Sequence, residues 1–183
     1  MKKCTYLIFI IFCFILVFFL YRENHARKTI SYANQVLNDY IKEPNNKAFH
    51  ALQELKKLTN ENSNNFQVRS LYLNILLLEK QYSLGLEQIK ILNRIKPLPL
   101  SKLNECILIE RIGDAVGHCY QDAIALFAAN NNRDDNYILA LKFANDPRFE
   151  DERKRLIETG RIIQEVQEII AMDKQTFLQT FYP

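Results

Sequence analysis

The chain begins with the longest apolar run in the sequence. From Cys4 to Tyr21 there are eighteen residues without a charge, a proline or a glycine, close to the roughly 20 that span a bilayer core as a helix. Bulky residues end the run, where a signal peptidase needs small side chains. The pattern predicts a cytoplasmic tail (1–4), an uncleaved transmembrane signal anchor (5–21) and a juxtamembrane linker (22–30). A cleaved signal peptide and a buried helix are the alternatives.

The orientation of the predicted anchor follows from the length of its N-terminal tail. Lys2 and Lys3 precede the run, and three basic residues follow it between positions 22 and 28, so the positive-inside count is close to balanced. A four-residue tail can remain in the cytosol while the rest of the chain is threaded across the membrane. We therefore expect a single-pass protein of a bacterial inner membrane, with residues 22–183 in the periplasm. The opposite orientation remains open.

Beyond residue 30, apolar residues recur at helical spacing and few strand-like alternations occur. Good helix formers dominate, and the whole chain has only 4 glycines and 5 prolines. We predict an all-α domain over residues 31–183, in which asparagine and serine cap the helices that follow each break. The breaks are rich in asparagine or contain proline: EPNN (43–46), NENSNN (60–65), KPLPLS (96–101), NNNRDDN (130–136) and NDP (145–147).

Three of the predicted helical segments share one pattern. Each has a small residue at its fourth position and a large apolar residue four positions later, and the small residues are 34 and then 38 positions apart. Small residues let two helices approach closely, and a residue four positions on lies on the same helix face. The small residues are Ala51, Gly85 and Ala123, and the large ones are Leu55, Ile89 and Phe127.

The segment 66–97 resembles the tetratricopeptide repeat (TPR). Tyr82, Gly85, Ile89, Leu92 and Pro97 fall where that repeat has its second-helix residues and its closing proline. The first helix matches less well, because a leucine at position 73 occupies the usual small position. The resemblance implies antiparallel helix pairs that stack and bind protein partners.

The TPR resemblance extends in degenerate form over residues 32–144. Tyr120 with Ala123, and Tyr137 with Ala140, repeat the spacing of a tyrosine and a small residue three positions later. The second of these is similar to the shorter Sel1-like variant of the repeat. In the 32–65 copy, a proline at position 44 falls inside the expected first helix. An ordinary bundle of amphipathic helices is the alternative.

The C-terminal segment has a different apolar pattern. Between Phe149 and Phe177 large apolar residues lie seven positions apart, which indicates a helix with a single apolar stripe. Repeat arrays need a terminal cap with one polar face, so we predict a C-terminal capping helix. A contact surface for a partner helix is the alternative. The stripe consists of Phe149, Leu156, Ile163, Ile170 and Phe177.

Charge and motifs exclude several classes of function. Without Lys2 and Lys3 the chain has 22 basic and 21 acidic residues and no basic stripe, so we expect no nucleic-acid partner. There is no glycine-rich phosphate loop and no serine flanked by glycines. Cys106, His118 and Cys119 lack zinc-ligand spacing, and His118 and Cys119 would point about 100° apart on a helix. We predict no enzyme activity, cofactor or metal.

Cys106 and Cys119 are candidates for a disulfide. In an unbroken helix, thirteen residues would separate their Cα atoms by roughly 20 Å, whereas a disulfide needs about 4.4–6.8 Å. A bond therefore requires a reversal centred between Ile112 and Gly113, and a turn at Gly117–His118 would leave the cysteines too far apart. We expect the bond if the segment lies in the periplasm and reduced cysteines if it lies in the cytosol.

These patterns lead to a functional hypothesis. We interpret the chain as a non-enzymatic, membrane-anchored protein-interaction module that faces the periplasm. Its overall resemblance to small anchored helical proteins of toxin–immunity loci implies an immunity protein that neutralises a cell-envelope toxin. The alternatives are an accessory subunit of an envelope assembly and an enzyme with an unrecognised site. The sequence does not identify the protein partner or its binding face.

Overall fold

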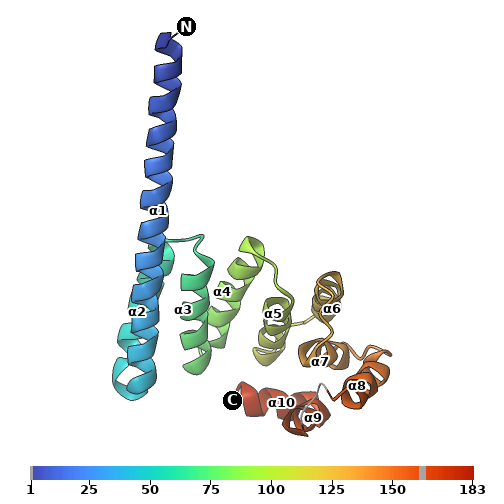
Figure 1. Ribbon diagram of the computed structural model, residues 1–183. Coiled ribbons are helices and arrows are strands. Elements are labelled where there is room, and N and C mark those ends of the chain that lie inside the picture. Colours follow the sequence, from blue (N-terminus) through green and yellow to red (C-terminus); the bar gives the residue numbers. More distant parts are fainter. Residues whose placement is uncertain (1, 161–163) are drawn as a thin grey trace. The chain divides into compact units, whose positions relative to one another are not determined.

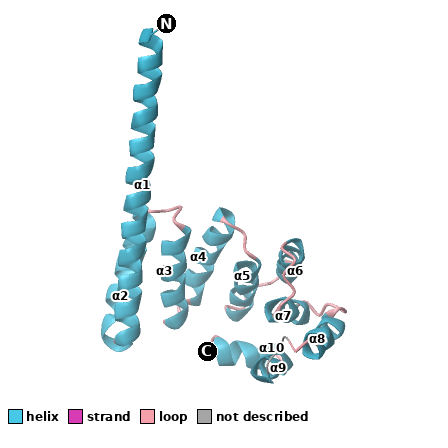
Figure 2. Ribbon diagram, in the orientation of Figure 1, coloured by secondary structure: helices cyan, strands magenta, loops and turns pink. Residues whose placement is uncertain are grey.

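The computed structural model shows an all-α protein with adjacent helices packed together, which confirms the all-α part of the predicted fold class. The structure describes the backbone of residues 2–160 and 164–183, and the side chains of residues 22–160 and 164–183. These described residues form ten helices and no strand (Figure 2). The chain divides into two compact units, Met1–Tyr72 and Leu73–Pro183.

The first unit is built on a pair of helices, α1 (Lys2–Lys42) and α2 (Pro44–Glu61), which lie side by side (Figure 1). The pair turns at Glu43, and Pro44 then occupies the first turn of α2, where its missing N–H costs no hydrogen bond. The beginning of α3 (Phe66–Leu78) completes this unit. Its core consists of residues at helical spacing: Ala33, Val36, Tyr40, Ala51, Leu55, Leu58, Val68 and Tyr72.

The predicted membrane anchor, residues 5–21, lies outside the residues whose side chains are described. Its backbone belongs to α1, which continues through residues 22–30, the predicted linker. Among the helices of the described part, none is both long and apolar enough to cross a membrane.

The second unit begins in the last part of α3 and contains seven further helices. They are α4 (Tyr82–Ile95), α5 (Pro99–Arg111), α6 (Cys119–Ala129), α7 (Asp135–Phe143), α8 (Phe149–Glu158), α9 (Gln164–Ala171) and α10 (Lys174–Phe181). From α4 to α7 each helix packs against the next, and α7 also contacts α8 and α9. The main core lies between α5, α6 and α7, where Leu103, Ile107, Phe127 and Leu141 are buried.

The helices end at the breaks that the sequence predicts. Each of the five asparagine-rich or proline-containing segments separates two helices. One break supplies a cap of the expected kind, because Asn65 Oδ1 accepts a hydrogen bond from Val68 N at 3.2 Å. At another break the cap is an aspartate, since Asp134 Oδ1 accepts a hydrogen bond from Tyr137 N at 3.1 Å. These bonds satisfy amides that have no partner within the helix. The helices α2, α5 and α8, which follow the other three breaks, have no side-chain cap among the described residues.

The prediction of one C-terminal capping helix is wrong. The segment forms three short helices, α8 to α10, because Gly160 adopts a left-handed backbone (φ 64°) and Asp173 starts a new helix by capping Thr176 N at 3.0 Å. Three residues of the predicted stripe are nevertheless buried. Leu156, Ile170 and Phe177 are 1%, 2% and 6% exposed, and Ile163 lies outside the described residues.

Candidate functional site

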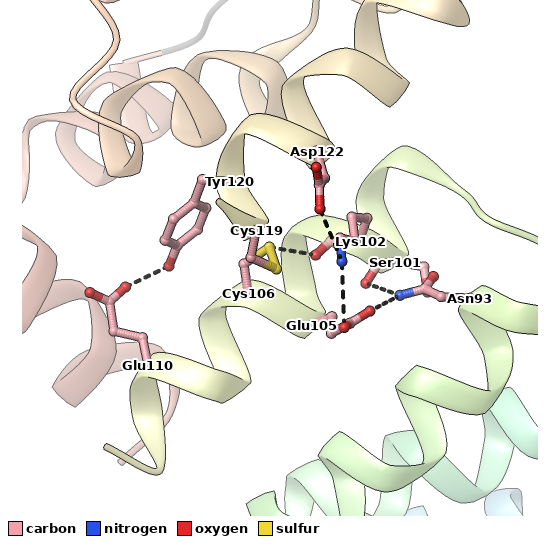
Figure 3. Close-up of a disulfide and its surroundings, with 9 residues drawn as sticks. All are labelled: Asn93, Ser101, Lys102, Glu105, Cys106, Glu110, Cys119, Tyr120 and Asp122. Carbon is pink, nitrogen blue, oxygen red and sulfur yellow. Dashed lines mark hydrogen bonds and ion pairs between the residues drawn. A yellow bond between two sulfur atoms is a disulfide. The ribbon is translucent and has the colours of Figure 1, made fainter. Parts of the chain in front are cut away.

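A disulfide between Cys106 and Cys119 joins α5 to α6, and its Cα atoms are 5.5 Å apart (Figure 3). The predicted reversal near Gly113 is confirmed, because α5 ends at Arg111 and Gly113 has a positive φ of 84°. Gly117, with a φ of 50°, lies in the same loop rather than at the end of a longer helix. Both cysteines are buried in the core of the second unit.

A buried polar cluster lies beside the disulfide (Figure 3). The Glu105 carboxylate, in a residue that is only 9% exposed, accepts a hydrogen bond from Asn93 Nδ2 at 2.6 Å and lies 3.5 Å from Lys102 Nζ. Lys102 Nζ is also 3.7 Å from Asp122 on α6. The cluster compensates the buried charge and connects α4, α5 and α6.

The arrangement around Cys119 offers no nucleophile. Cys119 has no thiol because it is part of the disulfide, so it cannot form a nucleophile–base pair with His118. His118 is exposed and precedes the first turn of α6. Within the described part of the chain, no three histidine, cysteine or acidic side chains are grouped as metal ligands would be.

Ten of the eleven residues predicted for repeat packing are buried, whereas Pro97 is exposed in the connection between α4 and α5. Residues that pack between helices must be buried, so the burial agrees with a packing role. The assignment of these residues to a TPR repeat stays a prediction. The small residues of the pattern do not keep to every second helix. Ala51, Gly85 and Ala123 lie on α2, α4 and α6, whereas Ala140 lies on α7. The buried residues are Ala51, Leu55, Tyr82, Gly85, Ile89, Tyr120, Ala123, Phe127, Tyr137 and Ala140.

Gly85 marks a close approach of helices. A Cβ atom at this position would lie 3.1 Å from Leu77 Cδ2 on α3 and 3.8 Å from Leu108 Cδ1 on α5. The first distance is shorter than an ordinary van der Waals contact. The small residue therefore lets α4 pack closely between its two neighbours.

Side chains of α4 and α5 hold the C-terminal residues of the chain through backbone carbonyl groups. Arg111 Nε donates a hydrogen bond to the carbonyl oxygen of Tyr182, and Tyr82 Oη donates one to that of Pro183 at 2.8 Å. The Arg111 guanidinium lies 5.0 Å from the centre of the Tyr82 ring, which adds a cation–π contact. Burial raises the pKa of the Tyr182 hydroxyl to about 12.

Lys174 fixes the beginning of α10 to the core. Its Nζ atom lies 3.0 Å from Glu110 Oε1 and 5.1 Å from the centre of the Tyr120 ring. Tyr120 Oη donates a hydrogen bond to Glu110 Oε2 at 2.6 Å (Figure 3). Burial and this hydrogen bond both raise the pKa of Tyr120. The three side chains connect α5, α6 and α10.

A pocket of about 390 Å³ lies between α5, α7, α9 and α10. Its walls are mainly apolar, and Phe181 on α10 is 44% exposed. Three polar residues, Asn104, Asp135 and Asn136, also line it. Its size is within the roughly 300–1,000 Å³ of typical ligand sites, which combine apolar walls with a few polar groups. The apolar walls include Leu103, Ile107, Leu139, Val166, Ile169 and Phe181.

The sequence did not predict this pocket. Asp135 and Asn136 belong to the segment NNNRDDN (130–136), which reads only as a helix break, and Phe181 follows the end of the apolar stripe. Helix periodicity identifies the inward face of each helix but not which distant helices enclose a space. The clearest signal for a site in the sequence was the pair of adjacent acidic residues at the start of α7, because a single acidic residue is sufficient to cap a helix.

The chain was compared with protein-family models, with curated proteins and with solved structures, and no match was found. The fold and the chemistry of the pocket are therefore the basis for a functional conclusion. They define an all-α protein in which a disulfide cross-links two helices and a mainly apolar pocket has polar residues at its edge.

Proposed function

We propose that this chain is a membrane-anchored protein-interaction module with its helical part on the periplasmic side. The observation that carries this proposal is the pocket between α5, α7, α9 and α10, with its apolar walls and the half-exposed Phe181 ring. Exposed aromatic side chains beside a concave apolar surface are typical of sites that bind another protein.

The proposed location depends on the apolar N-terminal run and on the disulfide. Residues 5–21 would anchor the chain in a bacterial inner membrane in a single pass. The Cys106–Cys119 bond supports the outward orientation of the helical part, because disulfides persist in the periplasm and are rare in the cytosol. A stack of TPR-like helix pairs would then present the pocket to periplasmic partners.

A more specific form of the proposal is an immunity protein that neutralises a cell-envelope toxin. Three features of the chain support this form: its small size, its single predicted anchor and a helical fold that is cross-linked by a disulfide. An accessory subunit of an envelope assembly is the alternative, followed by an enzyme with an unrecognised site. Challenge with toxins encoded beside the gene separates these functions. If cells that lack the protein resist each toxin as well as the parent does, the immunity function is excluded.

In-cell photo-crosslinking tests the interaction itself. A benzophenone side chain replaces Phe181 in the pocket wall, and a matched control places the same group at Lys154, an exposed residue of α8 whose side chain is 76% exposed. We expect a discrete crosslinked product with a periplasmic or membrane protein from position 181 and none from position 154. Products that contain only cytosolic proteins, or equal products from both positions, would contradict the proposal.

A further inference from the structure

The edge of the pocket has a carboxylate without a cationic partner. Asp135 is half-buried at the start of α7 and lines the pocket. Its only hydrogen-bond partner among the described residues is Asn136 Nδ2, at 3.4 Å, and it takes part in no ion pair there. Arg133, two positions earlier, lies 3.1 Å from Glu152 of α8 and is already paired.

The fold does not need this carboxylate as a helix cap. Asp134 already caps α7 by accepting a hydrogen bond from Tyr137 N at 3.1 Å. An additional acid in the first turn contributes only about 0.3–1 kcal/mol through the helix dipole. Asp135 is therefore available to a ligand at little cost to the stability of the helix.

The neighbouring helix α9 adds negative charge. Glu165 and Glu168 are exposed on this helix but are not part of the pocket lining, which α9 supplies through Val166, Ile169 and Ile170. Neither glutamate takes part in an ion pair within the described part of the chain. The Asp135 carboxylate in the pocket wall and the exposed glutamates of α9 repel phosphate groups and attract Lys or Arg. This charge favours a basic protein segment over an anionic lipid surface or a nucleic acid.

We propose that the pocket binds a protein segment with a bulky apolar side chain next to a lysine or arginine. The apolar side chain enters between α5, α7 and α9, and the basic group pairs with Asp135. A basic amphipathic helix has this chemistry, because its apolar and charged residues lie on adjacent faces. This inference rests on the proposed function, since it specifies the partner of the same pocket.

Peptide selection on the whole protein tests the inference. The full chain, in lipid nanodiscs, is presented to a phage library of random 14-residue peptides, and the enriched sequences are determined. We expect a shared motif in which a large apolar residue lies within four positions of Lys or Arg. A synthetic peptide with that motif should bind about 10-fold more weakly to Asp135→Asn, and with unchanged affinity to Asp114→Asn, an exposed control between α5 and α6.

A second variant separates failure of this inference from failure of the proposed function. Val166→Trp fills the pocket and should abolish binding, while circular dichroism and thermal melting confirm that it is folded. If selected peptides bind Val166→Trp or Asp135→Asn as tightly as the parent, the protein binds peptides but not through this site. Motifs without a basic residue, or motifs that match this chain itself, overturn the inferred partner. If no peptide is enriched, the inferred partner is overturned, whereas the proposed function is decided separately by crosslinking from position 181.

Discussion

Arg111 and Tyr182 are 71 positions apart in the chain and are joined by a hydrogen bond from the arginine Nε atom to the tyrosine carbonyl oxygen. The bond holds the last residues of the protein against α4 and α5. Because α10 also supplies a wall of the pocket, the end of the chain must stay in place for the pocket to keep its form.

Arg111→Ala should loosen this C-terminal attachment. Hydrogen bonds to charged groups contribute about 1.5–3 kcal/mol, so amide hydrogen exchange of residues 174–183 should accelerate by at least about 10-fold through local opening. Arg94→Ala is the matched control, because Arg94 is exposed in the last turn of α4. Equal exchange rates in the two variants would show that Arg111 does not hold the C-terminal residues.

The Cys106–Cys119 bond should be a main source of stability for the second unit. It closes a loop of 13 residues, which contributes about 3 kcal/mol in the chain-entropy model. We expect the double variant Cys106→Ala/Cys119→Ala to lose about that free energy of unfolding, measured by urea denaturation. A reductant should destabilise the parent by a similar amount and leave the variant unchanged. A parent that is insensitive to reductant would contradict this prediction.

Gly85 should tolerate a methyl group but not a large side chain. Gly85→Ala gains about 0.5–1 kcal/mol of helix stability, which the 3.1 Å contact with the flexible end of Leu77 largely offsets. The net change should be within about 0.5 kcal/mol. Gly85→Leu should cost about 2–3 kcal/mol through overpacking, whereas Ser83→Leu, on an exposed position of the same helix, should change stability little. Chemical denaturation measures all three variants.

Stability should fall at high pH, and Tyr182 should contribute to the loss. Its pKa is about 12 in the folded chain against a usual value of 10.0, so the unfolded state ionises first as pH rises. The contribution is fully present below pH 10 and is lost as pH rises towards 12, on the order of 2–3 kcal/mol. Tyr182→Phe removes this ionisation and keeps the backbone carbonyl. Denaturation curves between pH 9 and 12 should therefore show a smaller loss in the variant, and identical losses would refute the assignment.

Local patterns in the sequence were sufficient to predict most helix boundaries and the disulfide. Asparagine and proline interrupt helices through short-range chemistry, as at Asn65 and Pro44, and the two cysteines required a reversal that Gly113 could supply. The prediction of a single C-terminal helix was wrong for a related reason. A seven-residue spacing is compatible with one helix or with three short helices that each bury a residue such as Leu156 or Phe177, and the left-handed Gly160 decides between them.

The candidate site required contacts between residues far apart in the sequence. Asp135 and Phe181 line one pocket although 46 positions separate them, and no period in the sequence relates them. The same is true of Arg111 and Tyr182. The apolar pattern determines which face of a helix is buried, but the angles at which helices cross determine where a space remains between them.

The redox state of Cys106 and Cys119 in living cells tests most directly the central claim, that the helical part lies outside the cytosol. Cells that express a Cys4→Ser/Cys13→Ser variant are quenched in acid, and the protein is alkylated with a maleimide polymer with and without prior reduction. We predict no mass shift without reduction and addition of two polymers after it. Addition of two polymers to the unreduced protein would show free thiols and would contradict both the disulfide and the periplasmic location.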